Sequence, residues 1–125
     1  MTNGKSAPPK PDGAAFPKAR RILRPADFRK VYDEGFRLAG PCFAAFCWRG
    51  PEADGPRIGF TAPRALGKAV KRNRMKRRVR ECLRRNLSRL PAYWWVVINL
   101  RRQALEAPLP LIQQEVGRLI ERCKA

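Results

Sequence analysis

The chain is 125 residues long and carries a formal net charge of +18, from 28 Lys and Arg residues against 10 Asp and Glu residues. This length fits a single domain with a modest hydrophobic core, and the charge predicts a polyanionic partner. No apolar run approaches the ~20 residues that a membrane-spanning helix needs. Because histidine is absent and no C-x-x-C pair occurs, a zinc site is disfavoured.

The first 19 residues are rich in Pro, Gly, Ala and Lys and show no hydrophobic periodicity. They lack the apolar core of a secretory signal, so we expect residues 1–19 to form a disordered tail. Residues 20–125 are expected to form the folded domain. The cysteines are interpreted as reduced, mostly packed thiols of a cytoplasmic protein; they are Cys42, Cys47, Cys82 and Cys123.

A short helix followed by three strands is predicted after the tail. The helix spans 25–34, with a proline suited to its first turn and Gly35 suited to its end. The strands span 36–39, 42–49 and 57–62 and are separated by segments rich in Gly and Pro. The second strand is apolar on both of its alternating faces. We expect one face of the sheet to be buried and the other to be partly open.

A basic helix comes next. The segment from Lys68 to Arg89 contains eleven Lys or Arg residues and one acid, Glu81. Apolar residues recur beneath the charge at helical spacing and predict a stripe that packs on the core; they are Met75, Val79, Cys82, Leu83, Leu87 and Leu90. The opposite arc is almost purely cationic; it consists of Lys71, Arg74, Arg77, Arg78, Arg80, Arg84, Arg85 and Arg89.

The spacing of these cations favours a ligand over a merely solvated surface. Like charges stand three and four residues apart, as at Arg74 and Arg78, and each such pair costs ~0.2–0.5 kcal/mol in a free helix. Cations also lie near the helix start, which is the unfavourable end of the helix dipole. RNA would neutralise this field. A membrane surface is disfavoured because the apolar stripe contains no Trp or Phe.

The last two predicted elements are a strand and a helix. Residues 92–100 form a near-continuous apolar run, which predicts a central strand covered on both faces. Residues 108–123 show helical spacing and form a closing helix. The predicted order is therefore α-β-β-β-α-β-α, an α+β fold with one sheet.

Aromatic side chains offer a surface for unpaired bases. Phe28 and Tyr32 share a face of the first helix and are placed to meet Phe46 across the open face of the sheet, where each base stack would contribute ~1–3 kcal/mol. A core position explains these rings equally well, although the hydroxyl of Tyr32 needs a polar outlet. Asn73 either bonds RNA or is an ordinary exposed residue. The tryptophans are interpreted as core or sheet-surface residues; they are Trp48, Trp94 and Trp95.

The sequence lacks the groups that catalysis by the protein alone would need. There is no histidine to act as a base or a metal ligand. Glu81 is the only acid between Asp54 and Glu106, which leaves no carboxylate cluster there for a two-metal site. No Gly-rich phosphate loop is present. We therefore expect no catalytic residue and no metal or cofactor bound by the protein.

The basic helix contains a specific sequence motif. Lys71-Arg72-Asn73-Arg74-Met75-Lys76-Arg77, followed by Val79-Arg80-Glu81, resembles the signature helix of the bacterial ribonuclease P protein component. Three further segments are similar to that family: Phe28-x-x-Val31-Tyr32-x-x-Gly35, Ile58-Gly59-Phe60 and Gly67-x-Ala69-Val70. The strand Trp95-Val96-Val97-Ile98 fits more loosely. The resemblance extends from about residue 20 to the end of the chain.

The resemblance implies an α/β sandwich with the predicted element order and a four-stranded mixed sheet, similar to a domain of a small-subunit ribosomal protein. It also implies a left-handed βαβ crossover through the basic helix, which general chirality rules make rare. The family partners a catalytic RNA that removes the 5′ leader of precursor tRNA. By this resemblance, the RNA subunit and its Mg²⁺ ions perform the hydrolysis, while the protein binds the leader and steadies the RNA.

The resemblance also assigns roles to individual residues. The residues that match the surface facing the RNA subunit are Arg72, Asn73, Arg74, Lys76, Arg77 and Arg80, with Lys68 and Lys71 adding charge beside them. The residues that match the leader-binding cleft are Phe28, Tyr32, Phe46 and Thr61. Two segments depart from the family pattern. Pro63-Arg64-Ala65 replaces a hydroxyl residue and two lysines, and Asn99-Leu100-Arg101-Arg102 stands where Ala-Arg-Pro is common.

Three hypotheses are thus carried forward. The leading one is a non-catalytic subunit of a cytoplasmic ribonucleoprotein endonuclease, with RNA and precursor tRNA as partners and no membrane contact. A structural protein of ribosomal type that only coats folded RNA is the second. A metal-dependent nuclease acting alone is the third, and the lack of histidine and clustered carboxylates counts against it.

Overall fold

The computed structural model describes residues 20–51 and 55–124, so the predicted tail at 1–19 lies outside the described residues. The helices are α1 (Pro25–Glu34), α2 (Ala69–Asn86) and α3 (Leu109–Lys124). The strands are β1 (Phe36–Ala39), β2 (Phe43–Arg49), β3 (Arg57–Thr61) and β4 (Trp94–Leu100). Single 3₁₀ turns cover Arg64–Leu66, Leu87–Arg89 and Arg102–Ala104. The predicted order is confirmed, and the strand ends differ from prediction by at most two residues.

The strands form one mixed sheet in the order β1-β2-β4-β3. β1 pairs with β2, and β2 with β4, in antiparallel fashion, whereas β3 and β4 are parallel. α2 connects these two parallel neighbours. β4 therefore has a strand on each side, which explains why its sequence is apolar almost throughout and confirms the predicted central strand.

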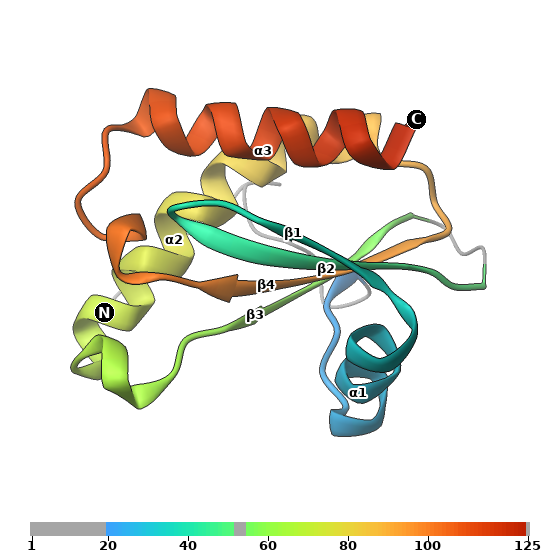
Figure 1. The fold of residues 1–125 in the computed structure, drawn as a ribbon, viewed down its shortest axis with the longest axis horizontal. Coiled ribbons are helices and arrows are strands. Elements are labelled where there is room, and N and C mark those ends of the chain that lie inside the picture. Colours follow the sequence, from blue (N-terminus) through green and yellow to red (C-terminus); the bar gives the residue numbers. More distant parts are fainter. Residues whose placement is uncertain (1–19, 52–54, 125) are drawn as a thin grey trace.

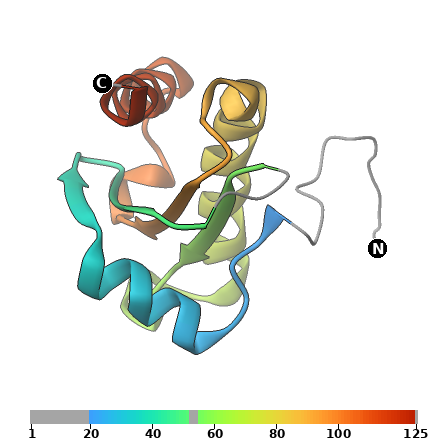
Figure 2. The ribbon, with the colours of Figure 1, turned by 90° about the vertical axis from the view of Figure 1, so that its right-hand side faces the viewer.

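Helices lie on both faces of the sheet, as Figures 1 and 2 show. α2 and α3 cover one face, and the main core forms between them and the sheet. Met75, Val79 and Leu83 of α2 are fully buried there, which confirms the predicted apolar stripe. Ile112 and Leu119 of α3 complete the same core.

α1 alone packs against the opposite face. Ile22, Val31 and Val97 form a small second core beneath it. A single helix does not cover this whole face. Four aromatic residues that pack against the second core are therefore only partly buried: Phe28, Phe46, Trp48 and Trp95. The partly open sheet face expected from β2 is thus confirmed.

The four cysteines are all buried and none forms a disulfide, as expected of packed thiols. Burial raises the pKa of Cys42 to about 12, with a further contribution from Glu115. Over residues 20–51 and 55–124, no helix has the length and apolarity needed to cross a bilayer.

Candidate nucleic-acid interface

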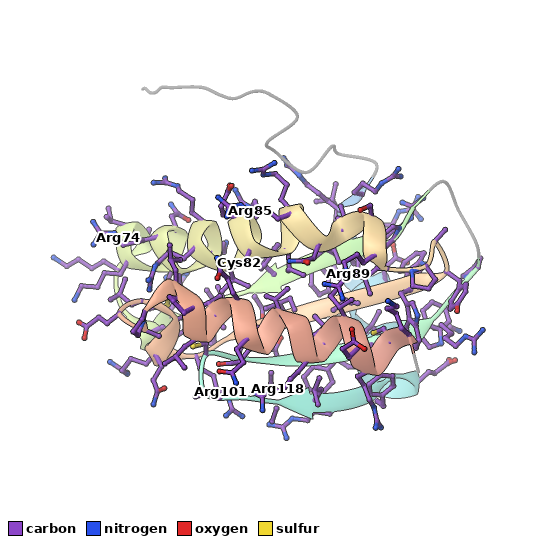
Figure 3. The ribbon with its side chains drawn as sticks, turned by 90° about the horizontal axis from the view of Figure 1, so that it is seen from above. Arg74, Cys82, Arg85, Arg89, Arg101 and Arg118 are labelled. Atoms are coloured by element: carbon purple, nitrogen blue, oxygen red, sulfur yellow. The ribbon has the colours of Figure 1, made fainter. Side chains whose placement is uncertain are left out.

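α2 presents a cationic surface on the side turned away from the core. Figure 3 shows Arg74 and Arg85 on the outer side of α2 and Cys82 between α2 and α3. Among the predicted RNA-binding residues, the exposed ones are Lys68, Lys71, Asn73, Arg74 and Arg77, and the half-buried ones are Arg72, Lys76 and Arg80. No acid occurs between Asp54 and Glu81 in the sequence, so the first half of α2 is purely cationic.

Arg72 also positions the loop that leads into α2. Its Nε atom donates a hydrogen bond to the carbonyl oxygen of Gly67 at 3.1 Å, and its Nη1 atom donates to that of Ala62 at 3.3 Å. Gly67 has a φ angle of 124°, a conformation that a residue with a side chain rarely adopts. The contacts of Arg72 therefore tie the end of β3 to the first turn of the basic helix.

Arg80 lies where several cations converge. Its guanidinium carbon is 5.8 Å from the centre of the Phe60 ring. Burial, followed by the nearby charges of Arg21 and Arg77, lowers the pKa of Arg80. Arginine stays charged at neutral pH nonetheless. Crowded cations of this kind gain stability when an anion such as phosphate approaches.

Arg78 was predicted to lie on the cationic arc, and for this residue the prediction is wrong. Its Nη1 atom donates hydrogen bonds to the carbonyl oxygens of Ala104 and Leu105, each at 2.8 Å, and its Nη2 atom donates to that of Ala107. These carbonyls belong to the turn between β4 and α3. One guanidinium with five donors can satisfy several of them together, and this outweighs solvation of the charge.

Arg84 is also engaged within the protein. It pairs with Glu81 one helical turn earlier, and Arg85 lies 3.6 Å from the same carboxylate. The hydrogen bond from Arg84 is the main reason that the pKa of Glu81 is lowered. The second half of α2 therefore mixes charges, and its cationic character is weaker than the sequence pattern suggested.

A groove between α1 and the sheet brings the predicted aromatic residues together. The rings of Tyr32 and Phe46 meet edge to face with centroids 4.9 Å apart. Phe28 lies over Gly59, where an added Cβ atom would stand 2.8 Å from its ring carbons. The groove has a volume of about 510 Å³ and is lined by Leu23, Pro25, Phe28, Arg29, Tyr32, Asp33 and Thr61.

Phe28 and Tyr32 line the groove, whereas Phe46 lies beside it against the ring of Tyr32. Tyr32 is 36% exposed, whereas Phe28 and Phe46 are half-buried against the second core. Arg37 adds a cation 6.0 Å from the centre of the Phe46 ring. A core role alone accounts for two of the rings but leaves the exposed face of Tyr32 unexplained.

Asn99 holds two of the groove residues in place, and the sequence interpretation did not select it. Its Oδ1 atom accepts a hydrogen bond from the hydroxyl of Tyr32 at 2.8 Å and another from the hydroxyl of Thr61 at 2.6 Å. It thereby joins α1, β3 and β4, and it is the hydrogen-bond partner that the hydroxyl of Tyr32 was expected to need. The available signal was one polar residue near the end of an otherwise apolar central strand.

The tryptophans occupy the core and sheet-surface positions that were predicted. Trp94 is buried, and its Nε1 atom donates to the carbonyl oxygen of Cys123 at 3.0 Å. Trp48 and Trp95 are half-buried on the α1 side of the sheet, where their ring centroids are 5.6 Å apart.

The described part of the chain, 20–51 and 55–124, contains no group of three His, Cys, Asp or Glu side chains that could hold a metal ion. Asp33 is the one acid among the residues lining the groove in that part. The groove is lined by aromatic rings and hydroxyls, groups that can bind nucleotides by stacking and hydrogen bonding.

The model of the ribonuclease P family matches residues 16–124. The chain belongs to the ribonuclease P protein family. The ribonuclease P protein component of Symbiobacterium thermophilum is 37% identical over 105 residues, which cover 84% of this chain and 91% of the relative. That of Chloroflexus aggregans is 37% identical over 106 residues, covering 84% and 78% respectively.

Solved structures of the family share the fold. The ribonuclease P protein of Staphylococcus aureus matches with a TM-score of 0.74 at 30% identity and covers 86% of this chain and 97% of its own. The Thermotoga maritima protein matches with a TM-score of 0.71 at 27% identity, covering 82% and 96%. This chain is thus the accessory protein subunit of ribonuclease P, which processes tRNA 5′ ends, and it associates with the ribonuclease P RNA.

Proposed function

We propose that the subunit binds two RNAs with two surfaces. The first half of α2 and the loop before it bind the catalytic RNA, and the groove beside α1 binds the 5′ leader of precursor tRNA. The RNA subunit and its Mg²⁺ ions carry out hydrolysis in the cytoplasm. The observation that carries this proposal is the adjacency of the two surfaces, since Arg72 on α2 is bonded to Ala62, the residue after the groove residue Thr61.

The first surface suits a folded RNA because its charge is high and lies on a rigid helix. Lys71, Arg74 and Arg77 are exposed on α2, and arginine forks bind phosphate oxygens in pairs. Arg72 is half-buried and holds the loop, so its role is to position this surface as well as to add charge.

The second surface suits a single strand. The exposed face of Tyr32 and the partly covered rings of Phe28 and Phe46 provide stacking platforms that accept any base. Thr61 contributes a hydroxyl that is oriented by Asn99. A leader leaving the cleavage site near α2 would enter the groove at this residue.

The proposed division of labour leaves no chemical step to the protein. The groove residues provide no histidine and no paired carboxylates, so a base, an acid or a metal must come from the RNA subunit. Mg²⁺ is accordingly assigned to the RNA subunit.

Reconstitution tests this proposal. The purified protein alone is expected to leave precursor tRNA intact, and together with a ribonuclease P RNA it is expected to allow cleavage at lower Mg²⁺ than the RNA needs by itself. Arg74→Gln should weaken this effect. Arg118→Gln, which removes the same charge from an exposed position on α3, should not. Cleavage by RNA-free protein would overturn the proposal.

A further inference from the structure

We propose that the turn between β4 and α3 supplies a phosphate-binding site for the catalytic RNA, with Arg102 and Lys71 as its two cations. This inference rests on the proposed function of α2 and extends the surface that binds the catalytic RNA to a second part of the chain. Arg102 belongs to neither of the two surfaces described above, and the basic helix pattern does not include it.

Two consecutive arginines after β4 have different partners. Arg101 is half-buried, and its Nη1 atom donates to the carbonyl oxygen of Gly40 at 3.0 Å. Arg102 is exposed, and its Nη2 atom donates to the carbonyl oxygen of Ala65 at 3.1 Å. Ala65 lies in the 3₁₀ turn that leads into the basic helix. Arg102 therefore reaches from the β4–α3 turn to the loop before α2.

The guanidinium of Arg102 keeps most of its hydrogen-bonding capacity. A guanidinium has five N–H donors, and the bond to Ala65 uses one of them. Over residues 20–51 and 55–124, Arg102 makes no other hydrogen bond and no ion pair. The remaining donors are sufficient for a paired contact with phosphate oxygens.

A pocket, here called the Arg102 pocket, lies between the start of α2 and this turn. Its volume is about 680 Å³, and it is lined by Leu66, Lys71, Arg102, Gln103, Leu105, Glu106, Ala107, Pro108 and Leu111. Both cations that line it are exposed. In the described part of the chain Glu106 forms no ion pair with either of them. Two cations that share one pocket favour an anion between them.

The two sides of the pocket are fixed to α2. Arg78 donates to carbonyl oxygens of the turn that carries Arg102, including those of Ala104 and Leu105 at 2.8 Å each. Arg72 donates to carbonyl oxygens of the loop before α2. The distance between Arg102 and Lys71 is thus set by the fold before RNA arrives, and a preorganised site loses less entropy on binding.

A phosphate of the catalytic RNA is the ligand that suits this pocket. Lys71 is part of the cationic surface of α2, so the pocket continues the surface proposed to bind that RNA. The described residues that line the pocket include no aromatic ring on which a base could stack. The site is therefore expected to add affinity without sequence preference, because phosphates are alike in all nucleotides.

The test measures binding of the purified protein to ribonuclease P RNA in the absence of tRNA. Arg102→Gln should weaken binding about three- to tenfold, the range for one hydrogen-bonded contact, and should lower the slope of log affinity against log salt by about one. Glu106→Gln removes a carboxylate from the pocket and should strengthen binding about twofold. Arg118→Gln is the control, since Arg118 lies on the side of α3 away from α2 (Figure 3).

A rescue variant separates the charge of Arg102 from its bond to the loop. Ala65 is exposed, so Ala65→Lys in the Arg102→Gln background returns a cation to the same place without the lost hydrogen bond. It should recover most of the affinity and the salt slope, whereas Ala65→Gln in that background should recover neither. Failure of Ala65→Lys, or equal recovery with Ala65→Gln, would show that Arg102 acts only by holding the loop and would overturn the inference.

Cleavage from a tethered reagent tests the location of the site. The four native cysteines are buried and Gln103 is exposed beside Arg102, so Gln103→Cys gives an accessible thiol for an iron–EDTA label. In the complex with ribonuclease P RNA this label should cut the RNA backbone, and the same label at Arg118→Cys should cut it much less. Equal cutting from both positions would contradict a site at the turn.

The proposed function and this inference can fail separately. If Arg102→Gln leaves affinity and slope unchanged while Arg74→Gln lowers both, the inference is wrong and the proposed function stands. If Arg102→Gln weakens only the binding of precursor tRNA to the assembled complex, the pocket serves the substrate and the inference is wrong. If neither Arg74→Gln nor Arg102→Gln weakens binding of the RNA subunit, both fail.

Discussion

The Nη1 atom of Arg78 lies 2.8 Å from the carbonyl oxygen of Ala104. The most basic helix of the chain thus uses one of its cations to hold the turn that precedes α3. The same guanidinium bonds Leu105 and Ala107, and it is half-buried. Arginines that look alike in the sequence therefore have different tasks, and substitutions can separate them.

Replacing Arg78 with Gln should destabilise the fold by about 2–4 kcal/mol, because three charge-assisted hydrogen bonds are lost and partly buried carbonyls remain unpaired. Chemical denaturation of the purified protein measures this change. The stability of Arg78→Lys should lie between that of Arg78→Gln and that of the wild type. A normal denaturation midpoint combined with reduced RNA affinity would show that Arg78 is a ligand of RNA instead.

Replacing Arg74 with Gln should lower the affinity for RNA and leave the stability of the fold nearly unchanged. Its side chain is exposed, so stability should change by no more than about 0.5 kcal/mol. Affinity for the ribonuclease P RNA should fall, and the slope of log affinity against log salt should decrease by about one. Salt titrations of Arg74→Gln and of Arg118→Gln make the comparison, and identical slopes for both variants would contradict a specific role for α2.

Removing the rings of the groove should affect only substrates that carry a leader. Phe28→Ala together with Tyr32→Ala should weaken binding of precursor tRNA by about 1–3 kcal/mol for each base stack lost. Binding of mature tRNA should hardly change. Leu109→Ala, which removes an exposed apolar side chain from α3, is the control. Equal losses for precursor and mature tRNA would exclude the groove as the leader site.

A methyl group at Gly59 should disturb the groove from below. The new Cβ atom would stand 2.8 Å from the ring of Phe28, so the ring must move, and leader affinity should drop together with stability. Gly117→Ala on α3 meets no atom within 4 Å and should stabilise the protein by about 0.5–1 kcal/mol, because alanine favours a helix interior. Thermal unfolding and leader-binding measurements on both variants provide the check.

Stability should fall in alkaline solution. Burial raises the pKa of Cys42 to about 12, whereas the ordinary pKa of a cysteine thiol is 9.0. The stabilising effect is complete below the unfolded value and is lost as pH rises toward the folded one, since only the unfolded chain releases the proton in that window. Denaturation at increasing pH should show this decline. Cys42→Ala should show a smaller decline, and an identical pH profile would assign it to other groups.

Local sequence patterns were sufficient to predict the helices and strands and to predict which face of α2 is buried. Met75 and Val79 recur at helical spacing and are buried as predicted, because a long amphipathic helix has one stable way to face a core. The alternation along β2 likewise predicted that one sheet face would be only partly covered. The ring contact between Tyr32 and Phe46 followed from these two predictions together.

The tasks of individual polar residues could not be read in the same way. Arg78 has the helical position of a surface cation, but its acceptors come from residues 104–107, whose path depends on the tertiary fold. Asn99 is one polar residue in an apolar strand, and its partners lie 67 and 38 residues away in sequence. Long side chains and distant partners are decided by the folded arrangement and not by periodicity.

Ile98 and Asn99 are consecutive in β4 and serve opposite sides of the sheet. Ile98 belongs to the core that contains Met75 of α2, and Asn99 is bonded at the groove. β4 is paired with a strand on each side, and it cannot slide relative to them without breaking its hydrogen bonds. The groove beside α1 and the cationic surface of α2 are therefore held at a fixed distance from each other.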